Sequence, residues 1–206
     1  MNEAPADLLR RFLRFSVRGL LLLIVVIAAL LGWTTHKARQ QATTVAKLEE
    51  FGCSVAYDRR KSPTMLERIR KLVGESQWRN VSGIAGRDSR MTDTELASLR
   101  ELSSLDWLVL KETAVTDAGL INLRGLTELK SLALSGTHVT DNGLVHLRGL
   151  TQLVHLYVDG TQVSDAGLVH LRGLGKLEAL MLTDTQVTDA GVQELQRALP
   201  NCKIVR

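Results

Sequence analysis

Residues 106–129 read DWLVLKETAVTDAGLINLRGLTEL, and residues 130–153 read KSLALSGTHVTDNGLVHLRGLTQL. Two further copies cover 154–177 and 178–201, and a degenerate first copy covers 82–105. The copies align without a gap at a period of 24 residues, so a repeat architecture is expected. A unit of this size cannot bury its own leucines, and neighbouring copies must therefore stack.

Each copy opens with the spacing L-x-x-L-x-L, as in Leu105, Leu108 and Leu110. This spacing predicts a short strand whose alternate residues point into the core. A threonine, Thr113 in this copy, follows at the position where a hydroxyl can bond the backbone of the turn leaving the strand.

A short helix is expected in the second half of each copy. Thr116 and its equivalents are candidate N-caps, each followed by an aspartate. In the first copy, Thr92-Asp93-Thr94-Glu95 is a complete capping box. Leu120 and Leu123 share one face of a helix of about two turns. Glycines are expected to end the helices as C′ residues, at Gly125, Gly149 and Gly173.

With these motifs, residues 81–206 resemble the leucine-rich-repeat family, in the subclass with the pattern T-x-V-T-D-x-G-L-x-x-L. The whole chain also resembles the single-pass leucine-rich-repeat proteins of planctomycete bacteria, through residues 14–18 (RFSVR) and 45–52 (VAKLEEFG). The resemblance implies an α/β solenoid of about five repeats with a binding role. Its parallel β-sheet would form the concave face and its short helices the convex face.

An uncharged apolar run extends from Gly19 to Trp33. With its flanking residues it reaches about 30 Å as a helix, and four arginines precede it. The positive-inside rule then predicts a cytoplasmic tail at residues 1–15 and a transmembrane helix at 16–34. The repeats would lie outside the cytoplasm, on the periplasmic side of a bacterial inner membrane. A cleaved signal peptide is the alternative, although residues 32–36 make a poor cleavage site.

Caps are expected at both ends of the solenoid, which we place at residues 81–206. A small α/β cap at residues 35–80 is predicted to contain a helix at Gln40–Phe51, a strand at Ser54–Tyr57 and a second helix at Pro63–Val73. A final strand around Lys203–Val205 would close the other end, with Ile204 in register with Leu180.

The isoelectric point of about 9.3 at first suggests a nucleic-acid partner. Residues 88–206, however, hold 11 basic and 15 acidic side chains, so no nucleic acid is expected on the repeats. Cys53 and Cys202 flank about five repeats at roughly 5 Å each. That separation exceeds the disulfide reach of about 7 Å, so two free thiols are expected.

The candidate ligand site is the concave face. The sequence contains no nucleotide loop, no Cys/His zinc spacing and no nucleophile motif, so we expect no enzyme activity, cofactor or metal. Exposed aromatic and methionine side chains between the buried leucines are typical of a binding surface, unless they merely shield the sheet. The predicted ligand-binding residues are Trp107, Val109, Lys111, His155, Tyr157, Asp159 and Met181.

Three further sets of side chains recur along the repeats. The first set, Arg100, Arg124, Arg148 and Arg172, is expected to neutralise helix-end carbonyls, or alternatively to contact an anionic lipid or polymer. The second set, Asp93, Asp117, Asp141, Asp165 and Asp189, is expected to cap helices, with a calcium ladder as the alternative. His146 and His170 are interpreted as surface histidines, with a metal site as the alternative.

The function predicted from these features is a membrane-anchored, non-catalytic interaction module that binds a protein or glycan. The alternative is a substrate-recognition adaptor of a larger enzyme complex, similar to leucine-rich-repeat ubiquitin-ligase adaptors. Those adaptors carry a separate ligase-binding segment, whereas this chain carries an apolar run at its N-terminus.

Overall fold

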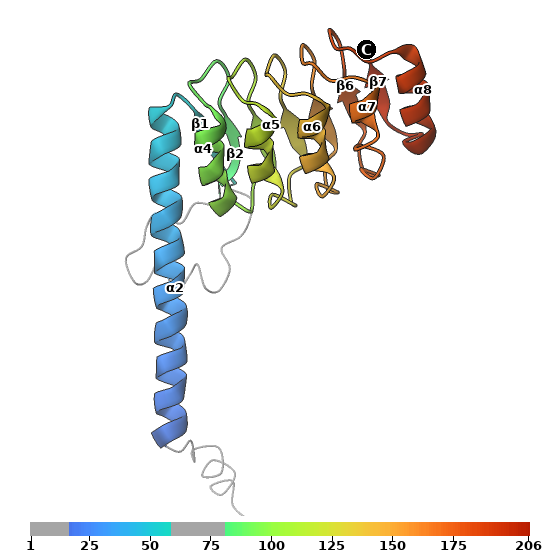
Figure 1. Ribbon diagram of the computed structural model, residues 1–206. Helices are drawn as coiled ribbons and strands as arrows, with labels where there is room; N and C mark the ends of the chain where they lie inside the picture. Colours follow the sequence, from blue (N-terminus) through green and yellow to red (C-terminus); the bar gives the residue numbers. More distant parts are fainter. Residues whose placement is uncertain (1–16, 59–80) are drawn as a thin grey trace, which may run out of the picture. The chain divides into compact units, whose positions relative to one another are not determined.

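The structure, a computed structural model, describes residues 17–58 and 81–206. The chain divides into two units, residues 1–40 and 41–206. In the second unit, strands follow one another side by side and short helices line the opposite side (Figure 1). The strands are β1 (Ser54–Tyr57), β2 (Val81–Ala85), β3 (Trp107–Val109), β4 (Ser131–Ala133), β5 (His155–Tyr157), β6 (Ala179–Met181) and β7 (Lys203–Val205).

The α-helices are α2 (Val17–Glu50), α4 (Asp93–Leu96), α5 (Asp117–Leu120), α6 (Asp141–Leu144), α7 (Asp165–Leu168) and α8 (Asp189–Ala198). Three of the short helices continue as 3₁₀ turns, η1 (Ala97–Glu101), η2 (Ile121–Leu123) and η3 (Val145–Leu147). The first three repeats therefore each consist of a short strand and about two turns of helix, as the sequence predicts. The fourth has only the four-residue α7, and the fifth has the longer α8.

The sheet has one strand from each of the five repeats, with β1 before them and β7 after them, in the order β1-β2-β3-β4-β5-β6-β7. All neighbours from β2 onward are parallel, and β1 is antiparallel to β2. Leu108, Leu132, Leu156, Leu180 and Ile204 occupy one row across β3 to β7. The predicted register of the closing strand with Leu180 is therefore confirmed.

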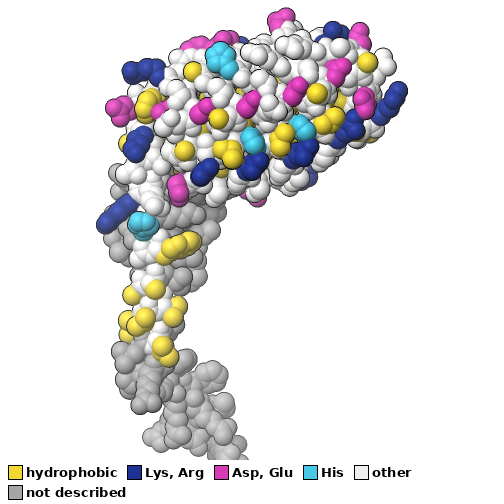
Figure 2. All heavy atoms as spheres, viewed as in Figure 1, with side chains coloured by type: hydrophobic (Ala, Val, Ile, Leu, Met, Phe, Trp, Pro, Cys, Tyr) yellow, Lys and Arg dark blue, Asp and Glu magenta, His cyan; other side chains and the backbone are white. Residues whose placement is uncertain are grey.

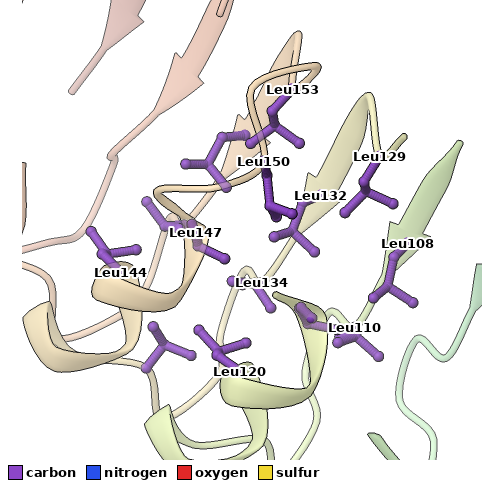
Figure 3. Close-up of a cluster of buried hydrophobic side chains, with 14 of the residues drawn as sticks. Leu108, Leu110, Leu120, Leu129, Leu132, Leu134, Leu144, Leu147, Leu150 and Leu153 are labelled. Carbon is purple, nitrogen blue, oxygen red and sulfur yellow. The ribbon is translucent and has the colours of Figure 1, made fainter. Parts of the chain in front are cut away.

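The core is a stack of leucine layers. Leu108 and Leu110 from one strand segment, and Leu120 from the following helix, are completely buried. Figure 3 shows the equivalent leucines of two consecutive repeats pointing into one space between the strands and the helices. Truncating one of these leucines to alanine typically costs about 2–5 kcal/mol, so the stack provides much of the stability.

The threonine after each strand anchors the turn, as predicted. Thr137 Oγ1 donates to the carbonyl of Leu134 at 2.6 Å, and Thr113 and Thr161 make the same bond at 2.8 and 2.6 Å. All three threonines are buried, so their hydroxyls need this partner.

A second set of hydrogen bonds joins each repeat to the next at the start of its helix. Asp117 Oδ1 accepts the backbone N–H of Thr140 at 2.7 Å, and Asp117 Oδ2 accepts its hydroxyl at 2.6 Å. Thr140 is the N-cap of α6, and its hydroxyl oxygen accepts from the N–H of Asn142. The pattern recurs for the pairs Asp93–Thr116, Asp141–Ser164 and Asp165–Thr188. We call this set the aspartate ladder.

The ladder explains the glycine that follows two residues after each aspartate. A Cβ built on Gly143 would lie 2.4 Å from Asp117 Oδ1, well inside van der Waals contact. Gly119, Gly167 and Gly191 are equally obstructed by the aspartate of the preceding repeat, at 2.2, 2.3 and 2.1 Å. The glycine is therefore needed for space and not for an unusual backbone angle.

The first repeat has no preceding aspartate, and Glu95 takes its place. Glu95 Oε2 accepts both the backbone N–H of Thr92, at 2.8 Å, and its hydroxyl, at 2.5 Å. This is the predicted capping box. Glu95 occupies the position that is glycine in all later repeats, because there the carboxylate comes from a neighbouring repeat.

The prediction for the helix-ending glycines is correct in position for Gly125 and Gly149, but Gly173 lies beyond the end of α7 at Leu168, and the predicted conformation is wrong for all three. Gly125 and Gly149 directly follow the C-cap residues Arg124 and Arg148. Among the described glycines, however, a positive φ is found only at Gly52, Gly136 and Gly160. The helices end in 3₁₀ turns whose last residues stay right-handed, so no left-handed C′ residue is needed there.

Helix α2 is continuous from Val17 to Glu50, so the predicted Gln40–Phe51 helix forms its last part. It ends in a Schellman motif at Gly52 (φ 90°), where the Cys53 N–H donates to the carbonyl of Leu48 at 3.0 Å. Leu48 is buried in the core of the second unit. The predicted strand Ser54–Tyr57 is confirmed as β1.

Three predictions for the first 80 residues are not confirmed. The tail at residues 1–15 and the helix at Pro63–Val73 lie outside the described residues. The predicted transmembrane segment at 16–34 falls within α2 from Val17 onward, and Leu22, Val25 and Trp33 are exposed there. Within residues 17–58 and 81–206, no helix is both long enough and apolar enough to cross a membrane.

We predict that Gly143→Ala destabilises the protein while Gly149→Ala does not. The methyl group at 143 would displace the Asp117 carboxylate and cost about 1–3 kcal/mol. No atom of another residue lies within 4 Å of a Cβ at Gly149, whose φ is not positive, so alanine there should change stability by less than about 1 kcal/mol. Urea unfolding of both variants tests this, and equal midpoints would contradict the role of the ladder.

Candidate ligand-binding face

The predicted binding residues project from the outward side of β3 to β6, which we call the sheet face. Strand pairing places Trp107, Ser131, His155 and Ala179 in one column and Val109, Ala133, Tyr157 and Met181 in the next. These columns are the ones that the repeat register predicts. All eight residues are half-buried, whereas the leucines between them are fully buried.

Trp107 lies flat against the sheet. A Cβ built on Gly83, its partner on β2, would fall 1.8 Å from Cε2 of the Trp107 ring. The indole therefore occupies the space above Gly83 and leans toward β2, away from β4. Trp107 shields the first strands of the sheet, which is the structural role that the sequence analysis left open for it.

The outward residues of β4 and its exit are all small. Ser131, Ala133 and Ser135 separate the Trp107–Val109–Lys111 row from the His155–Tyr157–Asp159 row. Trp107 and His155 are therefore two strands apart, or about 10 Å. The predicted residues do not form one continuous patch.

Two of the predicted residues are at the edge of the sheet face. Asp159 Oδ1 accepts a hydrogen bond from Ser135 Oγ at 2.8 Å, so its carboxylate is partly occupied within the protein. Lys111 is half-buried at the equivalent position two repeats earlier. The closest grouping of large predicted residues is His155, Tyr157 and Met181, since Tyr157 and Met181 are directly paired across β5 and β6.

The opposite side, formed by α4 to α7 with η1 to η3, is the helical face. Each arginine of the recurring set is expected near helix-end carbonyls, but the structure gives three of them other partners. Arg124 donates to His146 Nδ1 from Nε at 3.0 Å, and Arg148 donates to His170 Nδ1 from Nε at 3.1 Å. Arg172 pairs with Glu194. The partner belongs to the next repeat in each case.

Both imidazoles accept a hydrogen bond at Nδ1, so both rings are neutral with the proton on Nε2. Partial burial, followed by the charge of Arg124, lowers the pKa of His146. Partial burial and Arg148 lower the pKa of His170 in the same way. An imidazole whose Nδ1 is engaged by a guanidinium is a poor metal ligand, and residues 17–58 and 81–206 contain no metal-binding group of three or more His, Cys, Asp or Glu.

The aspartates do cap the repeats, but across the repeat boundary. Four of them accept hydrogen bonds from the N-cap residue of the following helix, so their oxygens are used by the protein itself. The last one, Asp189, pairs with Arg206. Sequence reasoning missed this longer-range role because an aspartate in a first turn is explained locally. The D-x-G spacing, repeated in four copies, is the pattern that indicates it.

Cys53 and Cys202 are free thiols, as predicted, with 5% and 4% of their surfaces exposed. Burial raises the pKa of both thiols, so the reactive thiolate is scarce at neutral pH. Neither cysteine has the exposed, electropositive surroundings of a catalytic thiol.

Comparison with known proteins assigns the repeats. The family model described as "Leucine Rich repeat" matches residues 126–147, which lie within the second and third copies. No curated protein matches the chain. The parallel strands, the buried leucine layers and the gapless register define a solenoid of stacked repeats. With the family match, residues 126–147 are identified as a leucine-rich repeat, and the other copies share their pattern.

Several solved structures resemble parts of this solenoid. An internalin from Listeria monocytogenes is 18% identical over 53% of this chain and 36% of its own, with a TM-score of 0.39. A leucine-rich-repeat protein from Leptospira interrogans is 18% identical over 53% of this chain and 27% of its own (TM-score 0.43). The leucine-rich-repeat ectodomain of a receptor kinase from Arabidopsis thaliana is 14% identical over 74% and 75% (TM-score 0.42). The first two matches span little more than a third of those chains, or less.

The neutral histidines predict a loss of stability at mildly acidic pH. Their pKa values are lowered in the folded chain, so the unfolded chain binds protons first as the pH falls. Their contribution to stability is therefore complete above about pH 6.5 and is lost as the pH falls through the folded pKa. Urea midpoints at pH 7.5 and 5.5 should differ less in His146→Gln/His170→Gln than in the native chain.

The control for this experiment is His138→Gln. No arginine of the described residues is hydrogen-bonded to this exposed imidazole, so the native pH dependence should remain. A double variant that keeps the full native difference between the two pH values would show that the arginine–histidine pairs are not responsible.

Proposed function

We propose that this chain is a non-catalytic interaction module that binds a protein or glycan ligand through its sheet face. The observation that carries the proposal is the grouping of His155, Tyr157 and Met181 on β5 and β6. Tyrosine and methionine are enriched at interface centres, because they offer large contact areas with few polar atoms to desolvate. In the structure all three are half-buried and face outward from the sheet.

The surroundings of this group support contact with a ligand. Its neighbours Ser131, Ala133 and Ala179 are small, so the larger side chains stand above them. Charged groups lie at the edges of the face, at Lys111, Asp159 and Lys203. An apolar centre with a polar rim is the usual arrangement of an interface. Trp107 contributes less, because its ring is packed over Gly83.

Membrane anchoring through residues 16–34 is the second part of the proposal, and it rests on the sequence alone. The uncharged run Gly19–Trp33 and the four arginines before it favour a single-pass protein with a cytoplasmic N-terminus and extracytoplasmic repeats. No specific observation favours the alternative role as an adaptor of an enzyme complex. The absence of a nucleophile motif in the sequence supports a non-catalytic role.

The sheet-face proposal predicts the outcome of site-specific crosslinking. A photoreactive amino acid at Met181 should capture a ligand in native membranes, and the same group at the exposed Gln162 should not. Tyr157→Ala should then weaken binding of that ligand by about 30-fold, as expected for a hot-spot residue worth about 2 kcal/mol. Unchanged affinity in Tyr157→Ala, with an unchanged unfolding midpoint, would refute the proposed site.

The topology is tested separately by protease accessibility. If the repeats are extracytoplasmic, trypsin added to intact spheroplasts should remove the solenoid epitope. Protection in intact spheroplasts, with cleavage only after lysis, would contradict the proposed orientation and leave the sheet-face proposal unaffected.

A further inference from the structure

We infer that the helical face is a second interaction surface, which docks on an anionic lipid surface. The inference does not depend on the sheet face. It starts from the apolar residues that the solenoid leaves uncovered. In the described part of the second unit, the exposed large hydrophobic side chains are Ile121 and Val169, each 42% exposed.

These two residues occupy the same position of the repeat. Ile121 is the C-cap of α5, Val169 is the C-cap of α7, and the half-buried Val145 holds this position on α6 between them. Consecutive strands lie about 4.8 Å apart, so the three side chains form a line roughly 10 Å long. We call this line the aliphatic stripe. Exposed Ala118 and Ala166 lie one helical turn before its two ends.

The stripe is bordered by positive charge that no carboxylate of residues 17–58 and 81–206 neutralises. Arg100, Arg124 and Arg148 are exposed, and none of them forms an ion pair with a carboxylate of the described residues. Arg124 and Arg148 donate to imidazoles that are neutral. Figure 2 shows the resulting pattern along the solenoid, where basic side chains and histidines lie beside hydrophobic ones.

The acidic side chains of this face keep their charge, but Asp117 and Asp141 form no ion pair with Arg124 or Arg148. The carboxylates of Asp117 and Asp141 are each held by two hydrogen bonds to the next repeat, and they are half-buried. Acidic side chains line one side of the stripe (Figure 2), and the arginine side is the one whose charges have no carboxylate partner among the described residues. Charge complementarity calls for an anionic partner.

The periodicity of the surface favours lipid over a single protein partner. The same pair of groups, an aliphatic side chain and an arginine three residues later, is present in three consecutive repeats. In the first two the arginine has no carboxylate partner among the described residues, and in the third Arg172 pairs with Glu194. A surface that repeats an aliphatic side chain beside a basic one is complementary to a partner that repeats apolar groups beside anionic ones. An anionic bilayer does so, because aliphatic side chains enter the acyl boundary while arginines pair with headgroups.

The test uses the full chain in nanodiscs of phosphatidylcholine, alone or mixed with phosphatidylglycerol. A polarity-sensitive dye is attached at Ala166→Cys, which is exposed beside Val169. The two native thiols are buried and react slowly, so labelling is selective. The dye emission should shift to shorter wavelength only with phosphatidylglycerol. A dye at Thr183→Cys, exposed after β6, should not respond.

Charge and apolar variants identify the surface. Arg124→Gln/Arg148→Gln should lower the docked-to-undocked ratio at least about tenfold, since each basic residue near an anionic surface contributes about 1 kcal/mol. Ile121→Ser/Val169→Ser should also reduce docking. Arg87→Gln/Arg90→Gln removes the same charge from an exposed loop elsewhere and should leave docking intact.

Three results would overturn the inference. The dye at position 166 could respond equally to both lipid compositions. The Arg124→Gln/Arg148→Gln variant could dock as well as the native chain. Soluble poly-L-glutamate could shift the dye as strongly as phosphatidylglycerol does, which would identify an acidic polypeptide as the partner instead.

Discussion

A carboxylate from the preceding repeat holds the start of each later helix in this solenoid. Asp117 binds both the backbone N–H and the hydroxyl of Thr140, and the same pair of bonds recurs at three other boundaries. Hydrogen bonds to charged groups contribute about 1.5–3 kcal/mol. The geometry also requires a glycine beneath each carboxylate. The position of each helix start, and the glycine two residues after each aspartate, therefore depend on one contact that no repeat can make alone.

Much of the fold could be predicted because it depends on spacing. The leucines at strand positions, the threonine turns and the N-caps all follow from short-range geometry that is the same in every copy. The arginine–histidine pairs could not be predicted in this way, because Arg124 and His146 lie 22 residues apart and meet only after the repeats stack. The contacts of the aspartate ladder between repeats were not predicted for a different reason. A local capping role explains the same residues equally well from sequence.

In the candidate site, too, the positions that follow from the repeat spacing were predicted, and the contacts made only in the folded chain were not. The repeat register placed the predicted residues that lie on strands in their columns of the sheet, namely Trp107, Val109, His155, Tyr157 and Met181. The register does not give the direction in which a large side chain leans. Trp107 covers Gly83, a residue of the degenerate first copy, so no regular pattern indicated that contact. As a result, the large predicted residues that remain grouped are those on β5 and β6. The arrangement of charges on the helical face cannot be read from the composition.

The first copy has a glutamate, Glu95, at the repeat position where the later copies have glycine. Glu95 closes the cap of its own helix, whereas Gly119 leaves space for a neighbour's carboxylate. Asp189, the equivalent aspartate of the fifth copy, binds no N-cap residue among the described residues and pairs with Arg206 instead. The copies are therefore not interchangeable. An inner copy could be duplicated or deleted as a whole. The same copy placed first would lack the carboxylate that binds the backbone N–H and hydroxyl of its N-cap residue. The amino-acid sequence thus records the position of each unit in the array as well as its shape.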